Sequence, residues 1–147
     1  MKHSSTKTHK NNEIAQFNVF FEDFPKINEH DLVFLQLIQW QPLYDLYIID
    51  NQVIATIEIA GVAAQDFVLY LNKRYMIIEG VRRTARATSA NCCTFHNIEI
   101  PYGRFTRKIE FPVPVQPSKY HASLADGMLV LRLPIVQEKV IPIEDEA

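Results

Sequence analysis

The stretch Ala122-Ser123-Leu124-Ala125-Asp126-Gly127-Met128-Leu129 decides the fold class of this chain. Its Asp126-Gly127 pair is a strong signal for a tight turn, because glycine adopts positive φ without steric cost. Apolar runs flank the turn, at Tyr120–Leu124 before it and at Met128–Leu133 after it. The stretch therefore predicts two antiparallel strands joined by a short turn.

Further segments toward the N-terminus have the two-residue period of strands. Between Phe105 and Phe111 the period is clean: alternate positions are Phe, Arg, Ile and Phe, and the positions between them are polar. The other expected strands are Tyr44–Ile49, Val53–Ile59, Phe67–Leu71 and Tyr75–Glu79. About seven short strands with turns between them predict an all-β fold, an immunoglobulin-like antiparallel β-sandwich.

One segment between the expected strands lacks any apolar period. Residues 81–91 carry Arg82, Arg83 and Arg86 among small and polar residues. This composition predicts a long loop.

Composition divides the chain into three zones. Residues 1–41 are an aromatic-rich N-terminal arm, residues 42–135 are the sandwich domain, and residues 136–147 are a C-terminal tail. In the arm, apolar side chains recur at spacings of three and four, which predicts a partly helical arm with one apolar stripe. The stripe comprises Ile14, Phe17, Phe20, Phe21, Phe24 and Ile27. Pro25 limits how far such a helix can run.

Overall composition excludes several classes of partner. Of the 147 residues, 48% are apolar and 22% are charged, so the chain can bury the core of one domain. The 15 basic and 17 acidic residues give a net charge of -2, which provides no basic field for nucleic acid or an anionic membrane. No apolar run approaches the roughly 20 residues that cross a bilayer, and no signal-peptide pattern follows Met1. We therefore expect a cytoplasmic protein with no nucleic-acid or membrane partner.

Residues with catalytic or metal-binding chemistry form no recognisable site. The adjacent Cys92 and Cys93 do not make a disulfide framework, and with His96 they supply only three of the four ligands of a structural zinc site. No phosphate-binding loop, dinucleotide fingerprint, metalloprotease motif or serine nucleophile motif occurs. We expect no enzyme activity, no metal or other cofactor, and no small-molecule substrate.

Five motifs, in order and spacing, resemble those of the small heat-shock protein family, whose core is the α-crystallin domain. They are Ala60-Gly61-Val62, Ile77-Ile78-Glu79-Gly80, the run from Phe95-His96 through Glu99 to Gly103-Arg104-Phe105-Thr106-Arg107, the turn stretch at 122–129, and Ile141-Pro142-Ile143. The resemblance spans residues 40–143. It implies an α-crystallin domain between the N-terminal arm and an extended C-terminal tail.

The tail motif has the form of a docking segment. Because proline restricts φ and side chains alternate along an extended chain, Ile141 and Ile143 lie on the same side of Pro142. The resemblance implies that this oligomerisation tail binds a groove of a neighbouring subunit, between the strands Phe67–Leu71 and Tyr120–Leu124. The groove residues expected are Phe67, Val68, Leu69, Tyr120, Ala122 and Leu124. The alternative is a tail that packs on its own domain.

The resemblance also implies a dimer formed by strand exchange. Phe95–Ile100 would leave its own sandwich on the long loop and pair with the edge around Leu43–Ile48 of the partner. Arg107, a charge on an otherwise apolar strand face, would contact the partner's loop. The interface residues expected are Phe95, His96, Ile98, Arg107, Leu43 and Leu46. Two alternatives stay open: the loop segment folds back on its own sheet, and Arg107 extends to the edge of its sheet.

Together these features predict an ATP-independent chaperone, or holdase, that binds unfolding client proteins and assembles as a homo-oligomer of dimers. Such a chaperone captures partly unfolded chains before they associate. The expected client-binding residues are Phe17, Phe20, Phe21 and Phe24, although burial of this stripe inside the oligomer is an alternative. The rival function is a co-chaperone-like β-sandwich adaptor with one defined protein partner.

Overall fold

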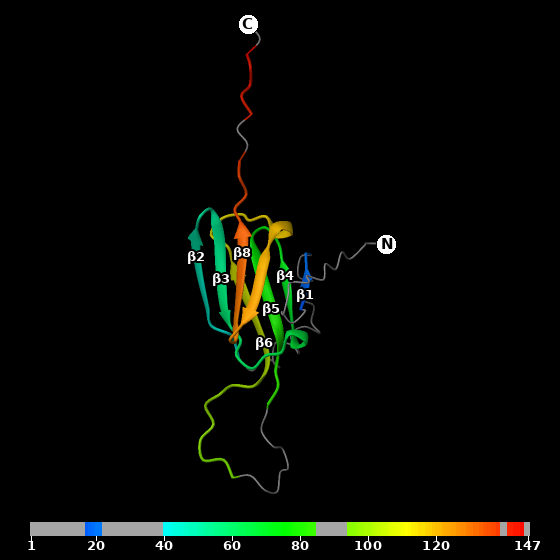
Figure 1. Cartoon of the computed structure of the whole chain (residues 1–147), viewed down its shortest axis with the longest axis vertical. Helices are drawn as coiled ribbons and strands as arrows, with labels where there is room; N and C mark the ends of the chain where they lie inside the picture. The colour runs from blue at the N-terminus through cyan, green and yellow to red at the C-terminus, as the bar shows by residue number, and fades with distance from the viewer. Residues whose placement is uncertain (1–16, 22–39, 85–93, 139–140, 146–147) are drawn as a thin grey trace, which may run out of the picture.

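The computed structural model describes residues 17–21, 40–84, 94–138 and 141–145. Two four-stranded sheets pack face to face (Figure 1). In order across the first sheet lie β1 (Asn18–Phe20), β4 (Phe67–Leu71), β5 (Tyr75–Arg82) and β6 (Gly103–Glu110). The second sheet contains β2 (Tyr44–Ile49), β3 (Gln52–Glu58), β8 (Met128–Pro134) and β7 (His121–Ala125). The predicted antiparallel sandwich is confirmed, and all seven expected strands are present.

The core lies between the two sheets and follows the two-residue period of the strands. In β6, Phe105 and Ile109 are buried, whereas Lys108 and Glu110 face solvent. The same alternation fills the core from the other strands. The largest fully buried side chains are Phe105, Ile54, Ile57, Ile59, Leu69, Leu71, Met76, Ile78, Ile109, Leu129, Leu131 and Leu133.

The turn between β7 and β8 has the predicted backbone conformation. Asp126 and Gly127 have φ values of 52° and 75°, both in the left-handed region. At position 127 glycine is also required by space, since a Cβ atom there would lie 2.8 Å from the Cα of Ala60. Two independent constraints therefore fix this residue.

The N-terminal arm differs from the expectation in the part that the structure describes. Residues 17–21 are extended, so the helix predicted from the phenylalanine spacing is wrong there. Asn18–Phe20 forms β1, which pairs in parallel with β4 through Asn18↔Val68, Val19↔Leu69 and Phe20↔Tyr70. The edge of β4 offers backbone partners, and a short helix without tertiary packing is marginal in water. Ile14, Phe24 and Ile27 lie outside the described residues.

Strand β5 is longer than the predicted Tyr75–Glu79 and continues to Arg82. Arg82 was expected in the loop, but it is only 7% exposed. Its Nε donates to the carbonyl oxygen of Ala60 at 2.8 Å, and its Nη1 donates to that of Pro101 at 3.1 Å. Its guanidinium lies 3.8 Å from the ring centroid of Trp40. These contacts satisfy the buried charge and hold the two ends of the long loop together.

Trp40 joins the segment before β2 to the same cluster. Its indole Nε1 donates to the carbonyl oxygen of Gly103 at 3.0 Å, and its ring lies 4.7 Å from that of Phe105. Residues 94–102 extend from the end of the sandwich opposite to the C-terminal tail (Figure 1). The cluster around Trp40 and Arg82 therefore closes the sandwich where the loop departs.

Candidate functional site: the groove between β4 and β7

The tail-accepting groove was expected between β4, in one sheet, and β7 with the residue before it, in the other. On β4, Phe67 and Leu69 belong to the buried core cluster. On the other side Tyr120 belongs to the same cluster, and Ala122 and Leu124 pack against it. Five of the six residues expected in the groove thus border the space between the sheets.

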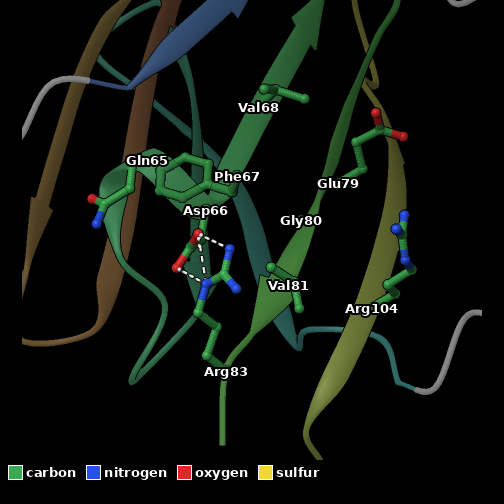
Figure 2. Close-up of a pocket in the computed structure, with 9 residues that line it drawn as sticks. All are labelled: Gln65, Asp66, Phe67, Val68, Glu79, Gly80, Val81, Arg83 and Arg104. Atoms are coloured by element: carbon green, nitrogen blue, oxygen red, sulfur yellow. Dashed lines mark hydrogen bonds and ion pairs between the residues drawn. The ribbon is translucent and has the colours of Figure 1, made fainter.

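Val68 is the exception. It lies between two inward-facing residues of β4, so its side chain points to the outer face of the sheet. There it lines a shallow depression with Glu79 and Arg104 (Figure 2). The side chain of Val68 thus faces away from the space between the sheets, because consecutive strand residues face opposite sides.

The chain's own N-terminal strand packs along this expected site. Val19 of β1 is 1% exposed and belongs to the core cluster. On either side of it, the ring of Phe17 stacks on that of Phe67 with centroids 5.2 Å apart, and Phe21 packs against Tyr120 at 5.6 Å. Phe20 points the other way and stacks on Tyr70 at 5.4 Å. The three inward residues of this segment therefore fill the site that the sequence assigned to the tail.

This occupation was not predicted, although the sequence contains a signal for it. Phe17, Val19 and Phe21 are apolar at every second position, as a strand docking on an edge requires. The stripe at spacings of three and four includes Phe17 and Phe21 but omits Val19. Only the burial of Val19 distinguishes the two-residue period of a strand from the spacing of three and four residues that a helix requires.

The tail motif is exposed. Ile141 and Ile143 are 79% and 89% exposed, and the tail extends away from the sandwich (Figure 1). At the start of the tail the backbone N–H of Val136 donates to the carbonyl oxygen of Pro114 at 3.0 Å, whereas residues 141–145 are exposed. Two apolar side chains remain available to another chain.

The candidate dimer residues fall into two groups. Phe95, Ile98 and Ile100 are at least half exposed, His96 is exposed, and residues 94–100 form no strand with their own sheet. Leu43 is 70% exposed beside β2, which is the edge strand of its sheet. Leu46, by contrast, packs against the core cluster from β2, so its side chain is directed inward.

Arg107 is not a buried charge. Its guanidinium lies 4.7 Å from the ring centroid of Tyr44 on β2, and its Nη1 approaches Oε1 of Gln41 at 3.4 Å. Both neighbours belong to the segment that leads into the edge strand β2. The side chain thus reaches from β6 across to the opposite sheet, close to the edge that was expected to receive a partner strand.

The depression in Figure 2 lies on the outer face of the first sheet and encloses about 430 Å³. At its rim the Nε of Arg83 donates to both carboxylate oxygens of Asp66 at 3.1 Å. Glu79, which also lines the depression, accepts a hydrogen bond at its Oε1 from the Tyr70 hydroxyl at 3.2 Å. Burial raises the pKa of Glu79, whereas the Tyr70 hydrogen bond and the charge of Arg104 act against this rise. The carboxylates of Asp66 and Glu79, which line the depression, therefore already have partners within the chain.

Neither a candidate metal site nor a membrane-spanning helix is found among the residues that the structure describes. Among the described residues there is no group of three or more His, Cys, Asp or Glu side chains that could hold a metal ion. Cys92 and Cys93 lie outside those residues. In the same part of the chain, no helix has the length and apolarity needed to cross a bilayer.

Comparison with known families agrees with this geometry. The sequence model described as the Hsp20/alpha crystallin family matches residues 48–145. The chain belongs to the Hsp20/alpha crystallin family. Membership of this family of small heat-shock proteins supports a chaperone function. Among curated proteins no match is found.

Solved structures of small heat-shock proteins resemble the chain. Heat shock protein 16.0 from Schizosaccharomyces pombe is 23% identical with a TM-score of 0.61, and the match covers 72% of this chain and 100% of that one. A small heat-shock protein from Xylella fastidiosa is 25% identical with a TM-score of 0.58, over 73% of this chain and 99% of that one. HspA from Xanthomonas axonopodis is also 25% identical, with a TM-score of 0.58, and the match covers 66% of this chain and 95% of that one. The shared fold is the α-crystallin sandwich.

Proposed function

We propose that this Hsp20 family protein is an ATP-independent holdase that binds unfolding proteins in the cytoplasm and assembles as a homo-oligomer of dimers. The observation that supports this most is the exposure of apolar segments on a sandwich whose core is already filled. Ile98 in the loop and Ile141 and Ile143 in the tail contribute nothing to that core. Such segments are available to other protein chains.

Assembly beyond the dimer is proposed to use the tail. Ile141 and Ile143 would dock in the groove between β4 and β7 of a neighbouring subunit. Full burial of each side chain contributes about 1.5 to 3 kcal/mol before ordering costs, so a single docked tail would be weak and reversible. The Xylella fastidiosa relative is described as having a distinct high-order structure, which is consistent with assembly in this family.

The dimer is proposed to form by exchange of residues 95–100. The exposed backbone of β2 is the free edge of the second sheet, and Leu43 beside it is exposed. A strand from a partner would pair with this edge and cover its apolar neighbours. Arg107, which already lies over Tyr44 of β2, would border that contact.

Client binding is proposed to involve the phenylalanines of the arm, Phe17, Phe20, Phe21 and Phe24. Three of them lie in the described segment 17–21, on a strand held by one neighbouring strand only. An edge strand of this length can detach without unfolding the sandwich. Its aromatic side chains would then contact partly unfolded chains.

Turbidity of a heat-unfolding client enzyme tests the proposal. At a fixed molar ratio the full-length protein should suppress light scattering in the absence of any nucleotide. Protection that requires ATP, or no protection of several unrelated clients, would contradict the holdase function. Tight binding of a single defined protein in place of many clients would instead favour the adaptor function.

A further inference from the structure

We propose that Arg82 is a positioning residue for strand exchange. With Trp40 it forms a clamp that fixes the donated segment, residues 95–100, relative to the edge strand β2 that receives the partner's segment. The inference rests on the strand-exchanged dimer proposed above. It adds the side chain that determines how well each subunit presents its own strand and its own receiving edge at the same time.

The Arg82 side chain joins segments that are far apart in the sequence. It extends from the end of β5, and its Nε donates to the carbonyl oxygen of Ala60 at 2.8 Å, in the turn after β3. Its Nη1 donates to the carbonyl oxygen of Pro101 at 3.1 Å, at the base of the loop. Its guanidinium lies 3.8 Å from the ring centroid of Trp40, which precedes β2. One side chain therefore holds the base of the loop against both open ends of the β2–β3 hairpin.

Local features of the chain before β6 direct the loop away from its own sheet. Pairing of β5 with β6 ends at Arg82↔Gly103, and Gly103 has a φ of 99°, a conformation that favours glycine. The indole of Trp40 donates to the carbonyl oxygen of Gly103 at 3.0 Å. Pro101 has no backbone N–H to donate to a neighbouring strand. Residues 94–100 consequently leave the sandwich without joining its sheets, from the end at which β2 begins (Figure 1).

A dimer with two-fold symmetry depends on this placement, because each subunit donates one segment and receives another. Once the first segment has paired, the second pairing takes place within the same complex. That second pairing is favourable only when the loop and β2 of each subunit are held at the correct relative position. The clamp contacts both the base of the loop and the segment that leads into β2.

The clamp also lowers the ordering cost of dimerisation. A loop with a free base loses conformational entropy when it pairs with a partner, whereas a base held by hydrogen bonds has already lost it in the folded subunit. Arg82 is 7% exposed, so little water competes for its contacts. It lies outside the apolar core cluster. Loss of the clamp should therefore weaken dimerisation more than it weakens the sandwich.

Sedimentation equilibrium of the full-length chain measures the contribution of the clamp. The parent protein carries Ile141→Ser and Ile143→Ser, so that assembly through the tails does not obscure the monomer–dimer equilibrium. Arg82→Gln in this background removes the charge over Trp40 and the planar group that bridges two carbonyl oxygens. We expect the dissociation constant of the dimer to rise about tenfold or more, because both exchanged strands lose their positioning.

The matched control is Arg83→Gln. Arg83 is the next residue, is exposed and pairs with Asp66, so this variant loses the same charge outside the clamp and should keep the dissociation constant of the parent. Ile109→Val deletes one buried carbon atom from the core. It should lower the stability of the sandwich in urea and leave the dimer unchanged. Arg82→Lys keeps the charge but cannot bridge two carbonyl oxygens as a planar guanidinium does, so its dissociation constant should be intermediate.

The fluorescence of Trp40 reports the state of the clamp, because it is the only tryptophan of the chain. At a concentration where each protein is monomeric, acrylamide should quench Trp40 more strongly in Arg82→Gln than in the parent or in Arg83→Gln. If Arg82→Gln does not fold, Trp40→Phe takes its place with the dissociation constant as its readout. It keeps a ring beside Arg82 and loses the hydrogen bond to Gly103, and the constant should rise roughly threefold or more.

Each outcome decides a separate point. A weaker dimer and a more accessible Trp40 in Arg82→Gln, with both controls unchanged, support the clamp. Equal dissociation constants of the parent and Arg82→Gln overturn the clamp and leave the dimer intact. Equal weakening by Ile109→Val assigns the effect to stability and also overturns the clamp, as does a weaker dimer with unchanged quenching. A parent that stays monomeric at every concentration overturns the proposed dimer, and the inference with it.

Discussion

Phe21 packs against Tyr120 with ring centroids 5.6 Å apart, and this contact joins the residue that follows β1 of the first sheet to the residue that precedes β7 of the second. Together with Phe17 on Phe67 and Val19 between them, it closes one side of the sandwich. The N-terminal arm thus contributes to the fold as well as to the proposed client surface. The free energy of unfolding that the docked arm contributes therefore reports whether its phenylalanines are held on the sandwich.

Substitution of Val19 tests whether β1 occupies the groove in solution. Val19→Ala should lower the free energy of unfolding by about 1 to 3 kcal/mol, since it deletes two buried methyl groups and leaves a cavity. Urea unfolding in the Ile141→Ala, Ile143→Ala background measures this effect without tails that could refill the groove. Asn18→Ala, at the exposed neighbour, should change the value by less than about 0.5 kcal/mol. Equal stability of the two variants would show that β1 is not docked.

Substitution of the tail isoleucines tests assembly. Ile141→Ala with Ile143→Ala should shift the native mass toward dimers while the thermal transition of the sandwich stays in place, because neither side chain is part of the core. Light scattering coupled to gel filtration measures the mass. Val136→Ala, at an exposed apolar residue nearer the sandwich, is the matched control. An unchanged oligomer mass would show that the motif does not link subunits.

Two changes test the dimer contact. Deletion of residues 95–100 should abolish most dimer by removing the exchanged strand. Arg107→Ala should weaken it by a smaller factor, because an exposed cation–π contact such as that with Tyr44 contributes about 0.5 to 1 kcal/mol. Lys108→Ala, on the opposite face of the same strand, should have no effect. Chemical crosslinking at low protein concentration provides the readout, and full dimer yield after the deletion would favour another interface.

The depression around Glu79 predicts a specific pH dependence. Burial raises the pKa of Glu79 above its ordinary value of 4.5, so the folded state holds this proton more tightly than the unfolded state. The associated stability is fully present below that ordinary value and is lost as pH rises through the raised pKa. Glu79→Gln should therefore stabilise the protein relative to the parent at neutral pH but not at pH 4. We expect a difference below about 1 kcal/mol because the carboxylate is half exposed.

Tyr70→Phe is a second variant that tests the direction of this pH dependence. The Tyr70 hydroxyl donates to the Glu79 carboxylate at 3.2 Å and holds its pKa down. Tyr70→Phe should therefore raise the pKa further and widen the pH range over which stability falls. Thermal melts of both variants between pH 4 and neutral pH measure the effect on stability. A parent and a Glu79→Gln protein with parallel pH profiles would contradict it.

The sequence predicted the sandwich well because its strands carry their own signals. The alternation in β6 and the Asp126-Gly127 turn are local, and each is decided within a few residues. The failures concern contacts between distant segments. Helical spacing at Phe17 and Phe21 is indistinguishable from strand alternation until the edge of β4 is known to be available. In the same way Arg82 is polar and lies two residues after Gly80, and only the carbonyl oxygens of Ala60 and Pro101 make its burial possible.

The expected groove between β4 and β7 also depends on contacts between distant segments, which the sequence pattern does not reveal. The resemblance implies the two strands that would border it; of the six residues expected there, five are directed into the sandwich and Val68 faces the other side of β4. No pattern in the sequence indicates that the groove is filled in the isolated chain. That occupation depends on the packing of Phe17 and Val19 on β4 and of Phe21 on Tyr120, which only the folded chain brings together.

Recovery of a soluble complex tests the central claim most directly. The full-length protein is heated with an aggregation-prone client in buffer without nucleotide, cooled, and separated by gel filtration with mass determination. We predict that the client elutes with the chaperone in particles larger than either protein alone, and that polar replacement of Phe17, Phe20, Phe21 and Phe24 reduces the amount recovered. A client that precipitates as it does alone, while the chaperone elutes unchanged, would contradict the account.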